Sequence, residues 1–235
     1  MLQTSAERIR QRLSDDDVVL DVGGWAKPFP RADWVLDLMP HETRGRYGRA
    51  GPGEERFDRD TWIERDICDH EPFPFRDRQI DFAICSHTLE DVRDPIWVCR
   101  ELNRVAKAGY LEVPSRLDEQ SRNVNGPWVG WSHHRWLIDV DDSGIVFVAK
   151  PHVLHGVDRY SFPAGFAQVL TAEERVQSLF WEREFAFRER IFFDPDELDA
   201  YLGGFVERET AARADRLAQR SRRTPMRRAV RALRR

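Results

Sequence analysis

The sequence has little cysteine and no long hydrophobic run. Its three cysteines, Cys68, Cys85 and Cys99, form no C-x-x-C pair, so we expect neither a disulfide framework nor a zinc knuckle. No stretch of about 18 consecutive apolar residues occurs, so no membrane-spanning helix is predicted. The polar N-terminal stretch lacks the apolar segment of a secretory signal, and we therefore expect a cytoplasmic protein.

Lysine is also scarce, because all but three of the 37 basic residues are arginine. The net charge of −4 argues against a nucleic-acid-binding protein. The last fifteen residues nevertheless hold seven arginines and no acid. This tail is either a solvated, frayed helix or a basic amphipathic helix that contacts anionic lipid headgroups, which predicts a peripheral position at the inner face of the membrane.

Short apolar runs, most of them followed by a glycine, an acid or a polar side chain, predict a parallel sheet. None alternates cleanly between polar and apolar residues, as expected for strands that are covered on both faces. A chain of 235 residues with 41% hydrophobic residues suits one α/β domain of ordinary size. The five expected strands are residues 18–22, 34–38, 63–68, 80–86 and 110–113.

One helix is well marked between the fourth and fifth expected strands. Asp94 is a plausible N-cap, Pro95 takes the first helical position, and Gly109 is expected to end the helix. A strand, a helix and a strand in this order imply a right-handed parallel crossover. We therefore predict an α/β fold with a Rossmann-like, mostly parallel sheet and helices on both faces.

Beyond residue 115 the sequence predicts additions to this core. Residues 135–140 and 144–150 form an expected β-hairpin, Thr171 and Glu174 form a capping box, and a helix is expected from Asp194-Pro195 to Gly203. We predict a core domain of residues 1–207, with an insertion or lid at about 116–165, and a basic helical C-terminal tail of residues 208–235.

Polar groups and glycines follow the expected strands where ligands bind in parallel sheets. Gly23 and Gly24 follow Asp21 and the first strand, where the missing Cβ lets the backbone approach a ligand, although an ordinary tight turn has the same pattern. Asp37 ends the second strand and can accept both ribose hydroxyls. Asp66 ends the third strand, and Ser86-His87 ends the fourth.

Taken in order, the segments LDVGG, VLDL, RDIC, PFPFRDRQIDFAICSHTLEDVRDP and RELNRVAKAGYLEVPS resemble class I S-adenosylmethionine-dependent methyltransferases of the small-molecule type. The resemblance covers about residues 18–115 and implies S-adenosyl-L-methionine as the cofactor. It assigns the glycine turn to the methionine end, the second-strand acid to the ribose and the third-strand acid to the adenine. The cofactor-binding residues implied are Asp21, Gly23, Gly24, Asp37, Leu38, Asp66, Ile67, Cys85 and Ser86.

Two features depart from the family pattern. A third glycine often follows the first two, whereas Trp25 stands here. Only nine residues separate Gly23 from Asp33, and two of them are prolines, so an irregular loop is expected in place of a crossover helix. These departures leave open a second hypothesis, a methyltransferase-like cofactor-binding or partner protein without methyl-transfer activity.

The reaction implied is methyl transfer to a small-molecule or glycan acceptor, with O-methylation expected. A hydroxyl acceptor must lose its proton, and histidine is well suited to take it near neutral pH. The candidates are His87, His133 and His134, and a strand-end cap or a solvated loop pair would explain them equally well.

Several alternatives concern the region after the fifth strand. Its histidines and aspartates include metal-ligand types, but their spacing matches no metal motif and no metal is expected. Trp128, Trp131 and Trp136 are either a stacking platform for the acceptor or packing residues. A nicotinamide oxidoreductase is disfavoured because no G-x-G-x-x-G follows the first strand. A nucleic-acid methyltransferase is disfavoured because no Asn/Asp-Pro-Pro-aromatic run follows the fourth.

Overall fold

The computed structural model describes residues 1–141 and 144–218. These residues form two compact units. Among the described residues, unit 1 comprises 1–115, 134–141, 144–149 and 176–190, and unit 2 comprises 116–133, 150–175 and 191–218.

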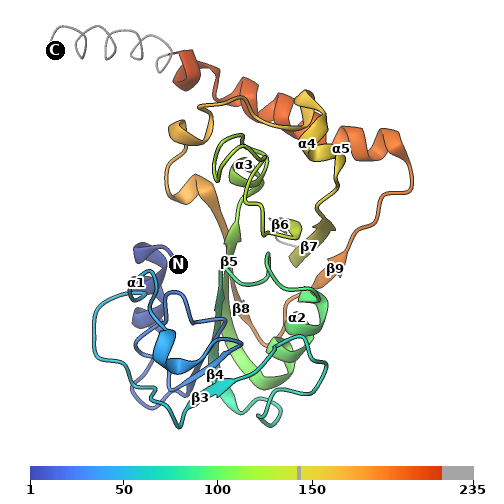
Figure 1. The fold of residues 1–235 in the computed structure, drawn as a ribbon. Helices are drawn as coiled ribbons and strands as arrows, with labels where there is room; N and C mark the ends of the chain where they lie inside the picture. Colours follow the sequence, from blue (N-terminus) through green and yellow to red (C-terminus); the bar gives the residue numbers. More distant parts are fainter. Residues whose placement is uncertain (142–143, 219–235) are drawn as a thin grey trace, which may run out of the picture. The chain divides into compact units, whose positions relative to one another are not determined.

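A six-stranded sheet is the centre of unit 1 (Figure 1). Its strands are β1 (Val19–Val22), β2 (Trp34–Asp37), β3 (Trp62–Glu64), β4 (Ile80–Ser86), β5 (Ala106–Pro114) and β8 (Val176–Glu182). The order is β3-β2-β1-β4-β5-β8, with parallel pairing from β3 to β5 and antiparallel pairing between β5 and β8. The predicted Rossmann-like, mostly parallel sheet is confirmed.

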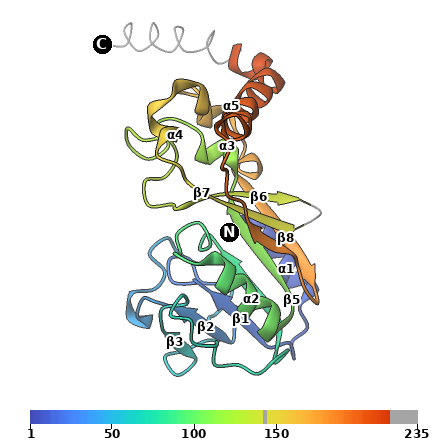
Figure 2. The ribbon, with the colours of Figure 1, turned by 90° about the vertical axis from the view of Figure 1, so that its right-hand side faces the viewer.

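Helices cover both faces of this sheet, as predicted (Figure 2). On one face, α1 (Gln3–Arg12) packs Ile9 into a core with Val19, Val35, Ile84 and Tyr110. On the other face, α2 (Pro95–Val105) packs Val98 and Leu102 into a core with Leu20, Leu36 and Cys85. Side chains alternate between the two faces along a strand, so consecutive residues such as Val19 and Leu20 lie in different cores.

The predicted start of α2 is confirmed, but its predicted end is wrong. The Asp94 side chain accepts a hydrogen bond from the Trp97 N–H, and Pro95 occupies the first turn. The helix ends at Val105, and Gly109 lies inside β5. A Cβ at Gly109 would lie 2.4 Å from the Ala83 carbonyl oxygen, so this glycine serves close packing within the sheet rather than helix termination.

The connection from β1 to β2 is an irregular loop, as the proline-containing segment predicted. Residues 23–33, all of which the structure describes, contain no helix. The loop buries Phe29 against the α1-side core and returns through a hydrogen bond from the Asp33 N–H to the Val19 carbonyl. A single 3-10 turn, η1 (His41–Thr43), lies between β2 and β3.

Unit 1 also contains a second, three-stranded sheet. The predicted hairpin is confirmed as β6 (Trp136–Asp141) and β7 (Gly144–Ala149), and β9 (Phe187–Glu189) pairs parallel with β7. Its buried residues Ile138, Ile145 and Phe147 belong to the α2-side core. Two strands, β8 and β9, were not predicted from the sequence.

Unit 2 has its own small core of Leu117, Phe162, Phe166 and Val206. Its helices are α3 (Arg116–Glu119), α4 (Val153–Gly156) and α5 (Pro195–Ala212), with 3-10 turns η2 (Asp158–Tyr160), η3 (Ala167–Val169) and η4 (Glu173–Arg175). The capping box of Thr171 and Glu174 forms, but it opens only η4, so the helix expected there is wrong. Helix α5 also continues past Gly203, where its end was predicted.

The predicted basic tail begins within α5, and its arginine-rich end from residue 219 lies outside the described residues. The predicted membrane contact of that tail therefore stays a prediction. Among the helices that the structure describes, none combines the length and hydropathy needed to cross a bilayer.

Candidate functional site

The strand register aligns three of the predicted site positions at the carboxyl edge of the main sheet. Val22 of β1 pairs with Leu36 of β2 and with Cys85 of β4. The next residue along each strand is therefore Gly23, Asp37 or Ser86, and Ser86 in turn pairs with Glu112 of β5. Since neighbouring strands lie about 4.8 Å apart, these groups form a continuous row along one rim.

The glycine turn at this rim is filled by the protein's own side chains. Gly23 has a φ of +76°, and a Cβ there would lie 2.1 Å from Oγ1 of Thr88. A Cβ at Gly24 would lie 2.5 Å from Oδ2 of Asp21. Both glycines are thus required by close contacts with Thr88 and Asp21, a reason that the turn pattern alone did not reveal.

Asp21 is buried beneath this turn. Its Oδ2 accepts a hydrogen bond of 2.8 Å from the Phe29 N–H. Burial raises the pKa of Asp21 to about 7, against the opposing effect of that hydrogen bond. The carboxyl group therefore titrates near neutral pH.

Asp37 holds the loop that follows the glycines. Its Oδ2 accepts a hydrogen bond from the Trp25 N–H and its Oδ1 accepts one from the Met39 N–H, each of 2.9 Å. Burial raises the pKa of Asp37 above its ordinary value. The Leu38 N–H also bonds to this carboxylate, which leaves about one further acceptor position for a hydroxyl donor. The neighbouring Leu38 side chain is 63% exposed and offers an apolar surface beside it.

The indole of Trp25 turns toward the η1 turn. Its Nε1 donates to the Thr43 carbonyl and to Thr43 Oγ1, and the ring packs against the α1-side core. Trp25 therefore ties the glycine turn to the loop between β2 and β3.

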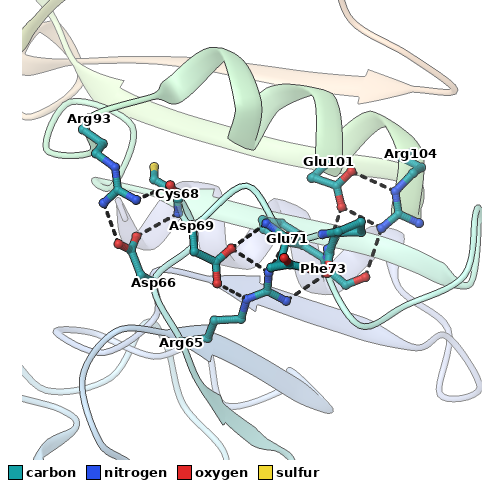
Figure 3. Close-up of polar contacts among 10 residues, drawn as sticks. Arg65, Asp66, Cys68, Asp69, Glu71, Phe73, Arg93, Glu101 and Arg104 are labelled. Carbon is teal, nitrogen blue, oxygen red and sulfur yellow. Dashed lines mark hydrogen bonds and ion pairs between the residues drawn. The ribbon is translucent and has the colours of Figure 1, made fainter.

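Asp66 follows β3 and is engaged by the protein itself (Figure 3). Its Oδ2 lies 2.5 Å from Nη1 of Arg93, and its Oδ1 accepts a hydrogen bond of 2.8 Å from the Cys68 N–H. Although partial burial raises it, these two contacts hold the pKa of Asp66 below its ordinary value. The neighbouring Ile67 is buried in the α2-side core.

His87 lies where β4 ends, in the left-handed region with a φ of +55°. Its Nδ1 is 3.3 Å from Oε1 of Glu90 and its Nε2 is 3.2 Å from Oε1 of Glu112. Burial opposes protonation of the ring, but the hydrogen bonds to these carboxylates outweigh it and raise the pKa of His87 to about 9. Cys85 is fully buried, and Ser86 Oγ donates to Glu112 at 3.4 Å.

Glu112 is a site residue that the sequence analysis missed. Its buried carboxylate accepts hydrogen bonds from Tyr110 Oη at 2.6 Å and from the Leu2 N–H, and lies 3.2 Å from the Met1 ammonium. Burial raises its pKa, yet the bonds from His87, Met1, Tyr110 and Leu2 hold the pKa well below the ordinary value. A charged residue inside the apolar run YLEV was the signal that could have revealed it.

The remaining sequence candidates are distributed over both units. In unit 1, His134 Nε2 lies 3.7 Å from Oδ1 of Asp91, and Trp136 donates its indole N–H to the Val92 carbonyl. His133 belongs to unit 2, as do Trp128 and Trp131. Trp131 donates to Asp118 Oδ2 at 3.0 Å, and Trp136 packs edge-on to Phe147, so both indoles have structural partners.

The groups at the rim fit the nucleoside end of S-adenosylmethionine. The Asp37 carboxylate can accept a hydrogen bond from a ribose hydroxyl, and the exposed apolar side chain of Leu38 lies beside it in the chain. The glycine turn beside them is narrower than an open cradle because Thr88 lies over Gly23. Asp66 could accept a hydrogen bond from an adenine amino group, but it already accepts one from Arg93.

Comparison with known families gives a sequence match inside this unit. Residues 48–111 match the family model described as a methyltransferase domain. The matched segment contains Asp66, Cys85, Ser86 and His87. A search of curated proteins gives no significant match.

Several solved structures resemble parts of the chain. One is a chain of the complex between the Haloferax volcanii Trm112 methyltransferase activator and a putative methyltransferase, at 19% identity and a TM-score of 0.36, covering 48% of this chain and 52% of that one. A putative methyltransferase from Bacillus halodurans has 18% identity, a TM-score of 0.34 and coverages of 48% and 51%. An S-adenosylmethionine-dependent methyltransferase from Mesorhizobium loti has 17% identity, a TM-score of 0.35 and coverages of 63% and 64%.

The chain thus spans between half and two thirds of the length of these structures. The sequence match to the methyltransferase domain model spans about a quarter of the chain.

Proposed function

We propose that this chain is a class I S-adenosylmethionine-dependent methyltransferase that methylates a hydroxyl group of a small molecule or glycan, a proposal that the match of residues 48–111 to a methyltransferase domain supports. The domain implies S-adenosyl-L-methionine as the cofactor. The observation that carries the proposal is the row of Asp37, Gly23 and Ser86 on three neighbouring strand ends within a methyltransferase-type sheet.

The proposed cofactor-binding roles are those that the family resemblance implies. We assign Asp37 to the ribose hydroxyls with Leu38 beside the base, and Asp21, Gly23 and Gly24 to the methionine end. Asp66 and Ile67 are assigned to the adenine, and Cys85 and Ser86 to the floor beside the sulfonium. Bound S-adenosylmethionine supplies a methyl group that is already activated, so the protein's task is to align the acceptor with it, which can lower the barrier by several kcal/mol.

The candidate bases are not equivalent in this structure. His87 binds one carboxylate with each ring nitrogen, and with a pKa of about 9 it is an imidazolium at neutral pH and cannot accept a proton. His134 Nε2 lies 3.7 Å from Oδ1 of Asp91, a carboxylate that can orient the ring of a histidine acting as a base. We therefore propose His134 or its neighbour His133 as the proton acceptor and His87 as a positioning residue.

Calorimetry with S-adenosylhomocysteine tests the proposal directly. Wild-type protein should bind it, and Asp37→Asn should bind at least 10-fold more weakly because a ribose hydroxyl loses its charged acceptor. Asp81→Asn is the matched control, since Asp81 is a partly exposed acid near the other end of β4, paired with Lys107 at 2.6 Å. Failure of the wild type to bind millimolar ligand would defeat the proposal.

A second candidate is a methyltransferase-like protein that binds the cofactor or a partner but transfers no methyl group. The helix-free loop at residues 23–33 and the engagement of Asp66 by Arg93 favour it. Stoichiometric binding of S-adenosylhomocysteine, together with no methyl transfer from labelled S-adenosylmethionine to a panel of hydroxyl-bearing acceptors, would support this candidate over the first.

We also propose a cytoplasmic protein whose arginine-rich C-terminus contacts the inner membrane face. The proposal rests on the sequence of residues 222–235. It predicts salt-sensitive sedimentation with vesicles that contain anionic lipid, and deletion of this segment should abolish the sedimentation. Equal sedimentation of the two proteins would reject it.

A further inference from the structure

Arg93 bridges two backbone segments at the carboxyl edge of unit 1. It precedes the N-cap of α2, and its guanidinium reaches the segment that follows β3 (Figure 3). Nη1 lies 2.5 Å from Asp66 Oδ2, and Nη2 donates to the Cys68 carbonyl. Arg93 therefore contacts both the side chain and the backbone of the segment that the family resemblance assigns to adenine.

A second bridge joins the same two segments. His70 Nε2 lies 2.9 Å from Oδ2 of Asp94, and the His70 ring stacks on Trp97 with centroids 5.0 Å apart. Arg65 differs from Arg93, since it pairs with Asp69 at 2.6 Å and donates to the Pro72 carbonyl within its own segment. Arg93 is thus the arginine in Figure 3 whose contacts include the Asp66 carboxylate.

We propose that Arg93 is a latch over the nucleobase end of the cofactor site, and this inference rests on the proposed function. A guanidinium N–H and the amino N–H of adenine are both planar donors that suit the same carboxylate oxygen. The ion pair with Arg93 offsets the charge at Asp66 Oδ2 and occupies one of its acceptor positions, so an incoming base meets a weaker acceptor while the latch is closed. Opening of the latch restores that acceptor, and the closed fraction therefore lowers the apparent affinity.

The exposure of the pair makes opening feasible. The side chains of Arg93 and Asp66 are 53% and 38% exposed. Ion pairs with this exposure change a binding constant by about 1.4- to 5-fold. Salt screens such pairs, so the latch should open more readily as ionic strength rises.

The test is calorimetric binding of S-adenosylhomocysteine, which carries no sulfonium charge, to four proteins. Arg93→Gln should bind about 1.4- to 5-fold more tightly than wild type. Arg65→Gln is the matched control. Its affinity should stay close to that of wild type, because Arg65 lies beside Asp66 in the chain but makes its ion pair with Asp69. Asp66→Asn should weaken binding, and an additional double variant that combines it with Arg93→Gln should bind no differently from Asp66→Asn.

A salt series on the unmodified protein gives an independent readout that needs no variant to fold. Wild-type affinity should rise between 50 and 500 mM salt, while that of Arg93→Gln should stay flat. Equal or weaker binding by Arg93→Gln, an equal gain in Arg65→Gln, or a wild-type affinity that does not rise with salt would overturn the latch and leave the proposed function standing. Absence of binding by all four proteins would defeat the proposed function and the latch together.

Discussion

The Nε2 atom of His87 lies 3.2 Å from Oε1 of Glu112, a carboxylate that is fully buried at the carboxyl end of β5. The other ring nitrogen faces Glu90, which is also buried and whose Oε2 has no hydrogen-bond partner among the described residues. Two acids thus enclose one imidazole in a position that sequence analysis assigned to a proton acceptor. The arrangement stabilises the protonated ring, which makes His87 a source of positive charge at the rim.

The pairing of His87 with Glu90 and Glu112 predicts a specific dependence of stability on pH. The folded-state pKa of His87, about 9, exceeds its ordinary value of 6.5. Its stabilising contribution is therefore complete below pH 6.5 and is lost as the pH rises through about 9. Glu112→Gln should lower the free energy of unfolding at pH 6 by about 2 kcal/mol, because a charged hydrogen bond is replaced by a neutral one.

Urea denaturation between pH 6 and pH 10, together with NMR titration of the His87 ring, measures both effects. Wild-type stability should fall across pH 7–9, and the His87 pKa should drop in Glu112→Gln. His155→Gln serves as the control, since burial lowers the pKa of His155 in unit 2. A His87 ring that titrates near 6.5 in wild type would show that Glu90 and Glu112 do not stabilise the protonated imidazole.

The glycine turn gives a second prediction, which separates backbone strain from crowding. Gly23→Ala should destabilise unit 1 by about 3 kcal/mol, from a left-handed backbone and from collision with Thr88. Gly48→Ala is the matched control, because Gly48 has a similar φ of +82° with no atom within 4 Å of the added Cβ. It should cost about 1 kcal/mol. Equal losses in chemical denaturation would mean that Thr88 does not crowd Gly23.

Asp21 gives a third prediction, with the opposite pH sign to a paired carboxylate. Burial raises its folded pKa from 3.8 to about 7, so the folded state binds more protons than the unfolded state between these values. Stability should therefore decrease as the pH rises from about 4 to about 7. Asp21→Asn cannot ionise, so its stability should exceed that of wild type more at pH 8 than at pH 4. A constant difference between the two proteins across this range would contradict the raised pKa.

The parallel core could be predicted because its signals are local. Apolar runs such as Ile80–Ser86 are buried on both faces, and Asp94-Pro95 marks the start of α2 by capping chemistry that acts within four residues. The short loop after Gly23 was also predictable, since chain length and two prolines leave no room for a helix.

What could not be predicted depends on contacts between distant residues. Strand β8 was hidden because Val176–Glu182 follows a genuine capping box, and only pairing with β5 makes it a strand. Gly109 was assigned to a helix end, although its reason lies in Ala83 across the sheet. At the site, nothing in the sequence near Asp66 indicates that Arg93, from the far side of β4, binds its carboxylate.

The last prediction concerns unit 2, where a buried ion pair should matter far more than an exposed pair of the same length. Lys150 Nζ lies 2.7 Å from Glu119 Oε2, with side chains 7% and 1% exposed, whereas Lys107 and Asp81 are 2.6 Å apart with the lysine 57% exposed. Lys150→Met removes the ammonium group from beside a buried carboxylate and should cost about 3–5 kcal/mol.

Lys107→Met should cost no more than about 1 kcal/mol, because water already solvates that pair. Adding Glu119→Leu to Lys150→Met should recover most of the lost stability, since it removes the buried charge and leaves apolar side chains of similar size. Thermal and urea unfolding of the three variants measures this. If the double variant is no more stable than Lys150→Met alone, the loss comes from the lysine's other contact, its hydrogen bond to the Trp131 carbonyl, and not from the charge of Glu119.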